Sequence, residues 1–238
     1  MANTPFLFTL LGATAYNPPM KTRSKNVIIG SIITNAALVL LGLFGMSVVL
    51  FRYLPGNDAF PWYYSLTYYT NLSNMILIVG AALCLKNDIL ELALKKTKPV
   101  FFYVKFSGVI TTLVTMTTVW IAVIFTLNPT FGVALNGSMW LLFHTICPLS
   151  GVLSFLFLDA KENIRKIQIL APAGLTIAYT VMMEILYATG GRIPYVSDFS
   201  DEPMKVNAWT FVILGLIESG LATGLGFLVR FLNNKKAK

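Results

Sequence analysis

The chain contains a single histidine, His144, which lies in the middle of an apolar stretch. The stretch covers residues 135–158 and is long enough to cross a membrane as a helix. A charged side chain at the centre of a bilayer costs roughly 2.5 kcal/mol or more, so ionisable residues there normally face the interior of a bundle and have a partner. The chemistry open to this protein therefore depends on the group that His144 meets.

A stripe of polar residues marks another apolar stretch, residues 62–85. Four of them recur at the spacing that places side chains on one face of a helix: Thr67, Thr70, Asn71 and Asn74. We expect this face to point into the bundle, where such residues hydrogen-bond across helices for about 0.6 kcal/mol each. The alternative to this structural role is a functional site, in which Asn71 or Asn74 would stabilise a reacting oxygen.

Thr70 and His144 are expected at the same depth in the membrane. They lie eight and nine residues after the start of their stretches, which corresponds to roughly 12–14 Å of helix. A threonine hydroxyl beside an imidazole has the parts of an activated nucleophile, in which histidine takes the proton while threonine attacks a carbonyl. The alternative is a core histidine that hydrogen-bonds a neighbouring carbonyl or hydroxyl group.

Two carboxyl groups are candidates to support His144. Glu184 and Glu218 both lie in later apolar stretches, and Glu218 is near the expected depth of Thr70. Either group could orient the imidazole, or burial could keep it protonated.

Two further reactive side chains lie inside apolar stretches. Cys147 follows His144 by three residues and competes as a nucleophile, but apolar neighbours favour the less reactive thiol form. Lys105 lies near the cytoplasmic start of its stretch, and we expect its amine to extend to the membrane surface. With one histidine and no CxxC pattern, the sequence predicts neither a metal site nor a cofactor.

Six apolar stretches position these residues. Of the 238 residues 56% are hydrophobic and 12% are charged, whereas soluble domains carry about 25% charge. The stretches long enough to cross a bilayer are residues 27–51, 62–85, 100–127, 135–158, 167–188 and 208–232. Only helices satisfy the backbone polar groups of a single segment in lipid, so even the β-branched third stretch is expected to be helical. The sequence therefore predicts an all-α polytopic membrane protein with six transmembrane helices.

Lysine and arginine are concentrated on one side of the predicted bundle. The opposite side holds only Arg52, Arg192 and Lys205, so the positive-inside rule places both termini in the cytoplasm. The net charge of +8 reflects this topology in a multi-pass protein of the cell membrane, and binding to nucleic acid is not expected. The predicted parts are an N-terminal interfacial segment (residues 1–26), a membrane domain (27–232) and a basic cytoplasmic tail (233–238).

Three segments resemble those of a known family. LTYYTNLSNM (residues 66–75) resembles the aromatic-Thr-x-x-Ser-Asn-Leu segment of the bacterial Pr6Pr family of six-helix membrane proteins. FHTICPL (143–149) resembles its His-x-x-x-Pro segment. Residues 179–199 resemble its late tyrosine-rich helix and the outer loop that follows.

The resemblance implies a lipid hydrolase. The Pr6Pr family is similar to the androgen-induced-protein family, membrane threonine hydrolases that cleave fatty-acid esters of hydroxy fatty acids. The resemblance implies that Thr70 is the nucleophile and His144 the base, that Tyr179 lies near the site, and that membrane lipid esters are the substrates. A non-enzymatic reading remains open: a small transporter or ligand-binding bundle in which His144, Glu184 and Glu218 form a relay.

Overall fold

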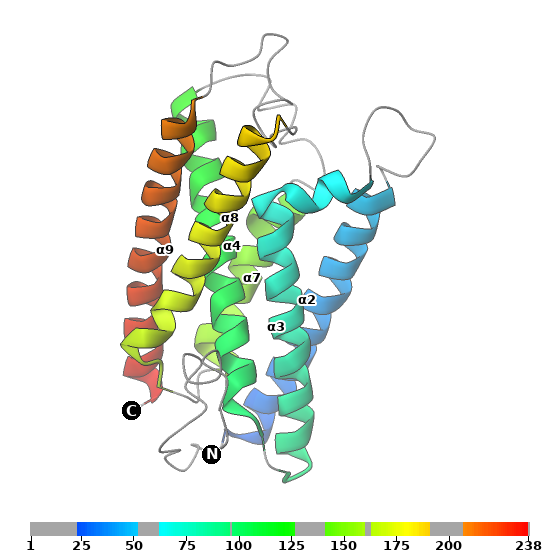
Figure 1. Ribbon diagram of the computed structural model, residues 1–238. Helices are drawn as coiled ribbons and strands as arrows, with labels where there is room; N and C mark the ends of the chain where they lie inside the picture. Colours follow the sequence, from blue (N-terminus) through cyan, green and yellow to red (C-terminus); the bar gives the residue numbers. More distant parts are fainter. Residues whose placement is uncertain are drawn as a thin grey trace, which may run out of the picture.

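The computed structural model describes residues 23–51, 62–95, 97–126, 141–159, 163–190 and 207–237. These parts of the chain are helical and contain no strand, as the sequence predicts. The long helices lie along one another in a bundle, and α2 begins at the end of the bundle where α9 finishes (Figure 1). Most of the predicted N-terminal segment (residues 1–22) and the outer loop after α8 (191–206) lie outside the described residues.

In the part of the chain that the structure describes, the bundle consists of six long helical segments. In chain order the elements are α2 (Lys25–Phe51), η1 (Trp62–Thr67), α3 (Tyr69–Leu92), α4 (Pro99–Thr126), η2 (Leu142–Ile146), α7 (Cys147–Ser154), η3 (Phe155–Asp159), η4 (Lys166–Ile169), α8 (Leu170–Ala188) and α9 (Ala208–Ala237). The segments η2, α7 and η3 form one continuous helix. The predicted basic tail largely continues α9.

Five of these segments are long and apolar enough to cross a membrane. They are Lys25–Leu50, Pro99–Ile121, Leu142–Asp159, Lys166–Ala188 and Trp209–Lys235. Many large apolar side chains on them are exposed, among them Leu40, Leu216 and Phe231. Such surfaces are unfavourable in water and suit lipid, so the chain is a membrane protein.

The second predicted span has different boundaries in the structure. Residues 62–67 form the short 3-10 helix η1, which lies across the end of α3 (Figure 1). Tyr68 has extended backbone angles, φ −77° and ψ 129°, so α3 begins only at Tyr69 and continues to Leu92. Thr70 therefore lies in the first turn of α3, and the prediction that it lies two turns inside a helix beginning at residue 62 is wrong.

Within the described residues 141–159, the helix that contains His144 has two wide, π-helical segments, η2 and η3. In η2 the amide of Cys147 donates to the carbonyl of Leu142, five residues earlier. Pro148 follows at the start of α7 and has no N–H to donate, so the regular ladder is interrupted here. Wider turns of this kind are frequent at functional sites, and His144 lies inside this one.

Helices α3 and α4 approach each other closely through two glycines. A Cβ on Gly80 would lie 2.5 Å from the Cα of Lys105, and one on Gly108 would lie 2.6 Å from the Cα of Leu77. Small residues permit such backbone contact between membrane helices, where van der Waals packing drives association.

Gly108→Ala should destabilise the protein by about 1–3 kcal/mol, because the added methyl group meets backbone atoms that cannot rotate away. Thermal unfolding in detergent measures the effect. Gly224→Ala on α9 is the matched control, since nothing lies within 4 Å of its added Cβ. A Gly108→Ala protein as stable as wild type would show that this packing is wrong.

Candidate functional site

Thr70 and His144 are in direct contact. Oγ1 of Thr70 lies 3.1 Å from Nε2 of His144, within hydrogen-bond distance. Thr70 is buried and His144 is half-buried, so the pair is largely shielded from its surroundings. The contact predicted from equal depth on two parallel segments is therefore present, between the first turn of α3 and η2.

The polar face of α3 points into the bundle, as the stripe in the sequence predicts. Thr70, Asn71 and Asn74 are 5%, 7% and 1% exposed. The fourth member, Thr67, belongs to η1 and is half-buried. Ser73 adds a contact to α4, with its Oγ 3.1 Å from Oγ1 of Thr115.

The amide groups proposed to stabilise a reacting oxygen are engaged with the backbone. Nδ2 of Asn71 donates to the carbonyl of Ser65 at 2.6 Å and thereby links α3 to η1. Nδ2 of Asn74 donates to the carbonyls of Thr70 at 2.8 Å and of Phe143 at 3.2 Å. Both hydrogens of the Asn74 amide are thus engaged with the backbone, as is one hydrogen of the Asn71 amide.

Helix α8 supplies the neighbouring wall of the site. The hydroxyl of Tyr69 lies 2.8 Å from Oγ1 of Thr176. The rings of Tyr69 and Tyr179 are 4.9 Å apart and tilted by 53°. Tyr179 thus contacts Tyr69, the residue directly before Thr70. The sequence did not single out Tyr69 or Thr176, although Thr176 and Tyr179 share a helix face at a three-residue spacing.

The two glutamates are not bonded to His144 among the described residues. Oε1 of Glu184 is buried without a hydrogen-bond partner there, and Glu218 is half-buried on α9. No hydrogen bond among the described residues therefore supports their predicted role in orienting the imidazole of His144. Cys147 and Cys84 are buried and form no disulfide among the described residues.

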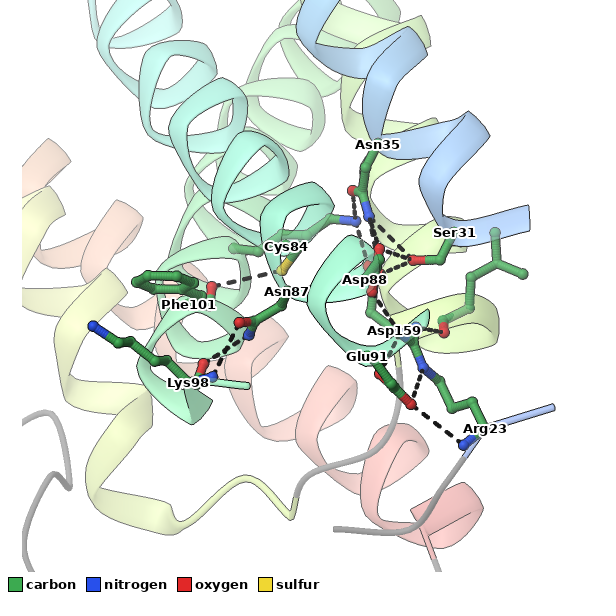
Figure 2. Close-up of polar contacts among 12 residues, drawn as sticks. Arg23, Ser31, Asn35, Cys84, Asn87, Asp88, Glu91, Lys98, Phe101 and Asp159 are labelled. Atoms are coloured by element: carbon green, nitrogen blue, oxygen red, sulfur yellow. Dashed lines mark hydrogen bonds and ion pairs between the residues drawn. The ribbon is translucent and has the colours of Figure 1, made fainter. Parts of the chain in front are cut away.

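A second polar group occupies the other end of the bundle, where α2 begins and α3 ends. Figure 2 shows carboxylates of α3 and η3 meeting side chains of α2. We call this group the ionic cluster; its members are Arg23, Ser31, Asn35, Asp88, Glu91, Lys105, Ser154 and Asp159. It contains two cations and three carboxyl groups.

Lys105 is the most deeply buried charge of the ionic cluster. Its side chain is 0% exposed and forms an ion pair with Asp159. Nζ also donates to Oδ1 of Asn35 at 2.6 Å and to Oγ of Ser154 at 2.7 Å. An ammonium has three hydrogens, and each has an acceptor here, which makes burial tolerable. The prediction that Lys105 extends to the membrane surface is therefore wrong.

Arg23 closes the ionic cluster from the chain before α2. Its Nη2 lies 2.5 Å from Oδ1 of Asp88 and 2.8 Å from Oε2 of Glu91, while Nη1 donates to the carbonyl of Leu158 at 2.6 Å. Burial alone would lower the pKa of this guanidinium, but the hydrogen bond to Glu91 and the charge of Asp88 outweigh burial and raise it. Arg23 therefore stays charged and joins α2, α3 and η3.

The sequence contained a signal for this cluster. A lysine inside an apolar stretch needs an acidic partner, just as His144 needs one. Asp88, Glu91 and Asp159 are the acids at the matching ends of neighbouring stretches. Which of them pairs with Lys105 depends on helix packing, which the spacing alone does not determine.

Comparisons with family models, curated proteins and solved structures found no match to this chain. A functional assignment therefore rests on the geometry of the two polar groups and on the resemblance of three segments.

Proposed function

We propose that this protein is an integral membrane hydrolase that cleaves lipid esters of the fatty-acid ester of hydroxy fatty acid type. The observation that carries the proposal is the 3.1 Å contact between Oγ1 of Thr70 and Nε2 of His144 in a largely buried site. The resemblance of the surrounding segments to the Pr6Pr family and the androgen-induced-protein family supports the same chemistry.

The reaction would proceed in two acyl-transfer steps. Nε2 of His144, unprotonated with its hydrogen on Nδ1, accepts the hydroxyl proton while Oγ1 of Thr70 attacks the ester carbonyl. The tetrahedral intermediate collapses, and the imidazolium returns the proton to the departing alcohol. Water, activated by the same imidazole, then cleaves the threonine ester and releases the fatty acid.

The start of α3 is suited to stabilise the negative oxygen of the intermediate. Thr70 is the second residue of α3, so its hydroxyl lies at the positive end of the helix dipole. Charge stabilisation by fixed dipoles is strong where water is excluded. Both hydrogens of the Asn74 amide and one of the Asn71 amide are engaged with the backbone, so we assign this role to the helix end.

A lipid substrate suits the surroundings of His144. Leu141 and Ile146, on either side of it in the chain, are 43% and 40% exposed on the apolar surface of the bundle. An acyl chain in the bilayer would lie against these side chains and bring its ester group to the half-buried imidazole.

Hydrolysis by purified protein tests the proposal. Wild-type protein in detergent micelles should release free fatty acid from a branched ester of a hydroxy fatty acid, measured by mass spectrometry. Protein with Thr70→Val, which keeps the shape but lacks the hydroxyl, should not. Equal release by both proteins would refute the threonine mechanism.

We propose a topology with six transmembrane helices, in which α3 crosses the membrane together with the five more apolar segments. Both termini then lie in the cytoplasm, and the protein lies in the cell membrane. The support for this topology is the excess of lysine and arginine on one side and the end of the bundle shared by the start of α2 and the end of α9 (Figure 1). A cysteine placed at Asn57 should react with an impermeant maleimide in intact cells, and one at Lys95 should not. The reverse labelling pattern would overturn this topology.

A second candidate function, proton transfer by a non-enzymatic bundle, is favoured by the ionic cluster. Oγ of Ser31 lies 2.6 Å from Oδ2 of Asp88 and 2.6 Å from Oδ1 of Asp159. This hydroxyl bridges carboxyl groups from two different helical segments, which is the arrangement that a hydrogen-bonded relay requires.

Reconstituted liposomes separate the two candidates. A proton-transferring bundle should dissipate an imposed pH gradient, and Ser31→Ala should slow that dissipation. A hydrolase without transport should leave the gradient intact while still cleaving the ester.

A further inference from the structure

Asn74 connects the two segments that hold Thr70 and His144. It lies one turn after Thr70 on α3, and its Nδ2 donates to the carbonyl of Thr70 at 2.8 Å. The same nitrogen donates across the helix boundary to the carbonyl of Phe143 at 3.2 Å. Phe143 directly precedes His144, so one amide joins the backbone of the nucleophile to the backbone beside the base.

The carbonyl of Phe143 needs a donor from outside its own helix. In a regular α-helix it would accept from the amide of Cys147, but that amide donates to Leu142. In a π-turn it would accept from residue 148, which is proline and has no N–H. A buried carbonyl without a donor is costly, and the amide of Asn74 satisfies this one.

The orientation of the Asn74 amide is determined by these contacts. Both partners are carbonyl oxygens, so the nitrogen must face them. The side chain is 1% exposed, and water does not compete for its hydrogens. Together with the bond between Thr70 and His144, these contacts form a closed ring across the interface of α3 and η2.

We propose that Asn74 is a positioning residue that fixes the distance and angle between the hydroxyl of Thr70 and the imidazole of His144. The inference rests on the proposed hydrolase function for its catalytic consequence. It assigns Asn74 a different role from that of an oxyanion donor, because both of its amide hydrogens are already used.

The single histidine makes a direct test possible. Protein labelled with ¹⁵N-histidine gives the imidazole signals of His144 alone, whatever the activity of the protein. Thr70→Val should shift the Nε2 resonance by removing its partner, and Asn74→Leu should shift it by moving that partner. The rate of labelling by an alkyl fluorophosphonate should fall about 100-fold in Asn74→Leu, as expected for a small displacement of reacting groups, and the pH profile of labelling should shift with the imidazole.

Asn87→Leu is the matched control. Asn87 is also on α3 and 2% exposed, and its Nδ2 donates to a backbone carbonyl across a helix boundary, that of Lys98 at 2.7 Å (Figure 2). This variant should lose stability but leave the Nε2 resonance and the labelling rate unchanged. If Asn74→Leu does not fold, Asn74→Ala removes both donated hydrogens without adding bulk or charge and should give the same shifts.

Two results distinguish failure of this inference from failure of the proposed function. An unchanged Nε2 resonance and labelling rate in a folded Asn74 variant would overturn the positioning role. Wild-type protein that resists the fluorophosphonate, while its Nε2 resonance still responds to Asn74→Leu, would support the positioning role and overturn the hydrolase.

Discussion

Replacing His144 with alanine should lower the rate of ester hydrolysis by about 10²–10⁴-fold, the usual contribution of a general base. Thr70→Val should remove the activity, since no hydroxyl remains to form the acyl intermediate, whereas Thr70→Ser should retain part of it. In the double variant His144→Ala with Thr70→Val, the losses of activity should not add, because the two side chains act as one unit. Initial rates with a branched fatty-acid ester in micelles measure all four proteins.

Cys147→Ala is the control for these variants. Cys147 is a buried free thiol three residues after His144, and we give it no part in the reaction. Its replacement should leave the rate close to that of wild type. A Cys147→Ala protein without activity, beside an active Thr70→Val protein, would show that Cys147 and not Thr70 is the nucleophile.

Lys105→Met should lower the free energy of unfolding by roughly 3–5 kcal/mol, because it leaves the carboxylate of Asp159 buried without its cation. The ion pair is almost completely buried, with side-chain exposures of 0% and 3%. Chemical unfolding in detergent, followed by circular dichroism, measures the loss.

Two variants show whether the loss comes from the unpaired charge. Lys86→Met removes an exposed lysine from α3 and should change stability little. Lys105→Met combined with Asp159→Leu removes both charges and should recover much of the stability. A single Lys105→Met protein as stable as the Lys86→Met control would contradict the buried ion pair.

The length and apolarity of the spans were predictable because bilayer thickness fixes helix length. Five predicted stretches agree with the structure to within a few residues at the ends that lie in the described part of the chain; the predicted start at residue 135 lies outside it. The burial of Thr70, Asn71 and Asn74 was also predictable, because a polar stripe at helical spacing avoids lipid. The contact of Thr70 with His144 was predicted from equal depth on two parallel segments and is present, although Thr70 lies in the first turn of its helix.

Other parts of the site depend on local breaks that periodicity does not reveal. The extended backbone of Tyr68 separates η1 from α3, yet residues 62–85 read as one apolar run. The roles of Asn74 and Lys105 depend on carbonyls and carboxylates contributed by other helices. Partners of this kind are set by helix packing and by the π-turn before Pro148, and spacing along one segment does not specify them.

The most direct measurement is the identification of the residue that a fluorophosphonate modifies. Purified protein is treated with an alkyl fluorophosphonate, digested, and mapped by tandem mass spectrometry. We predict a single adduct on Thr70, which is lost in His144→Ala because the hydroxyl is no longer activated. An adduct on another residue, or the absence of any adduct on wild-type protein, would contradict a threonine nucleophile activated by His144.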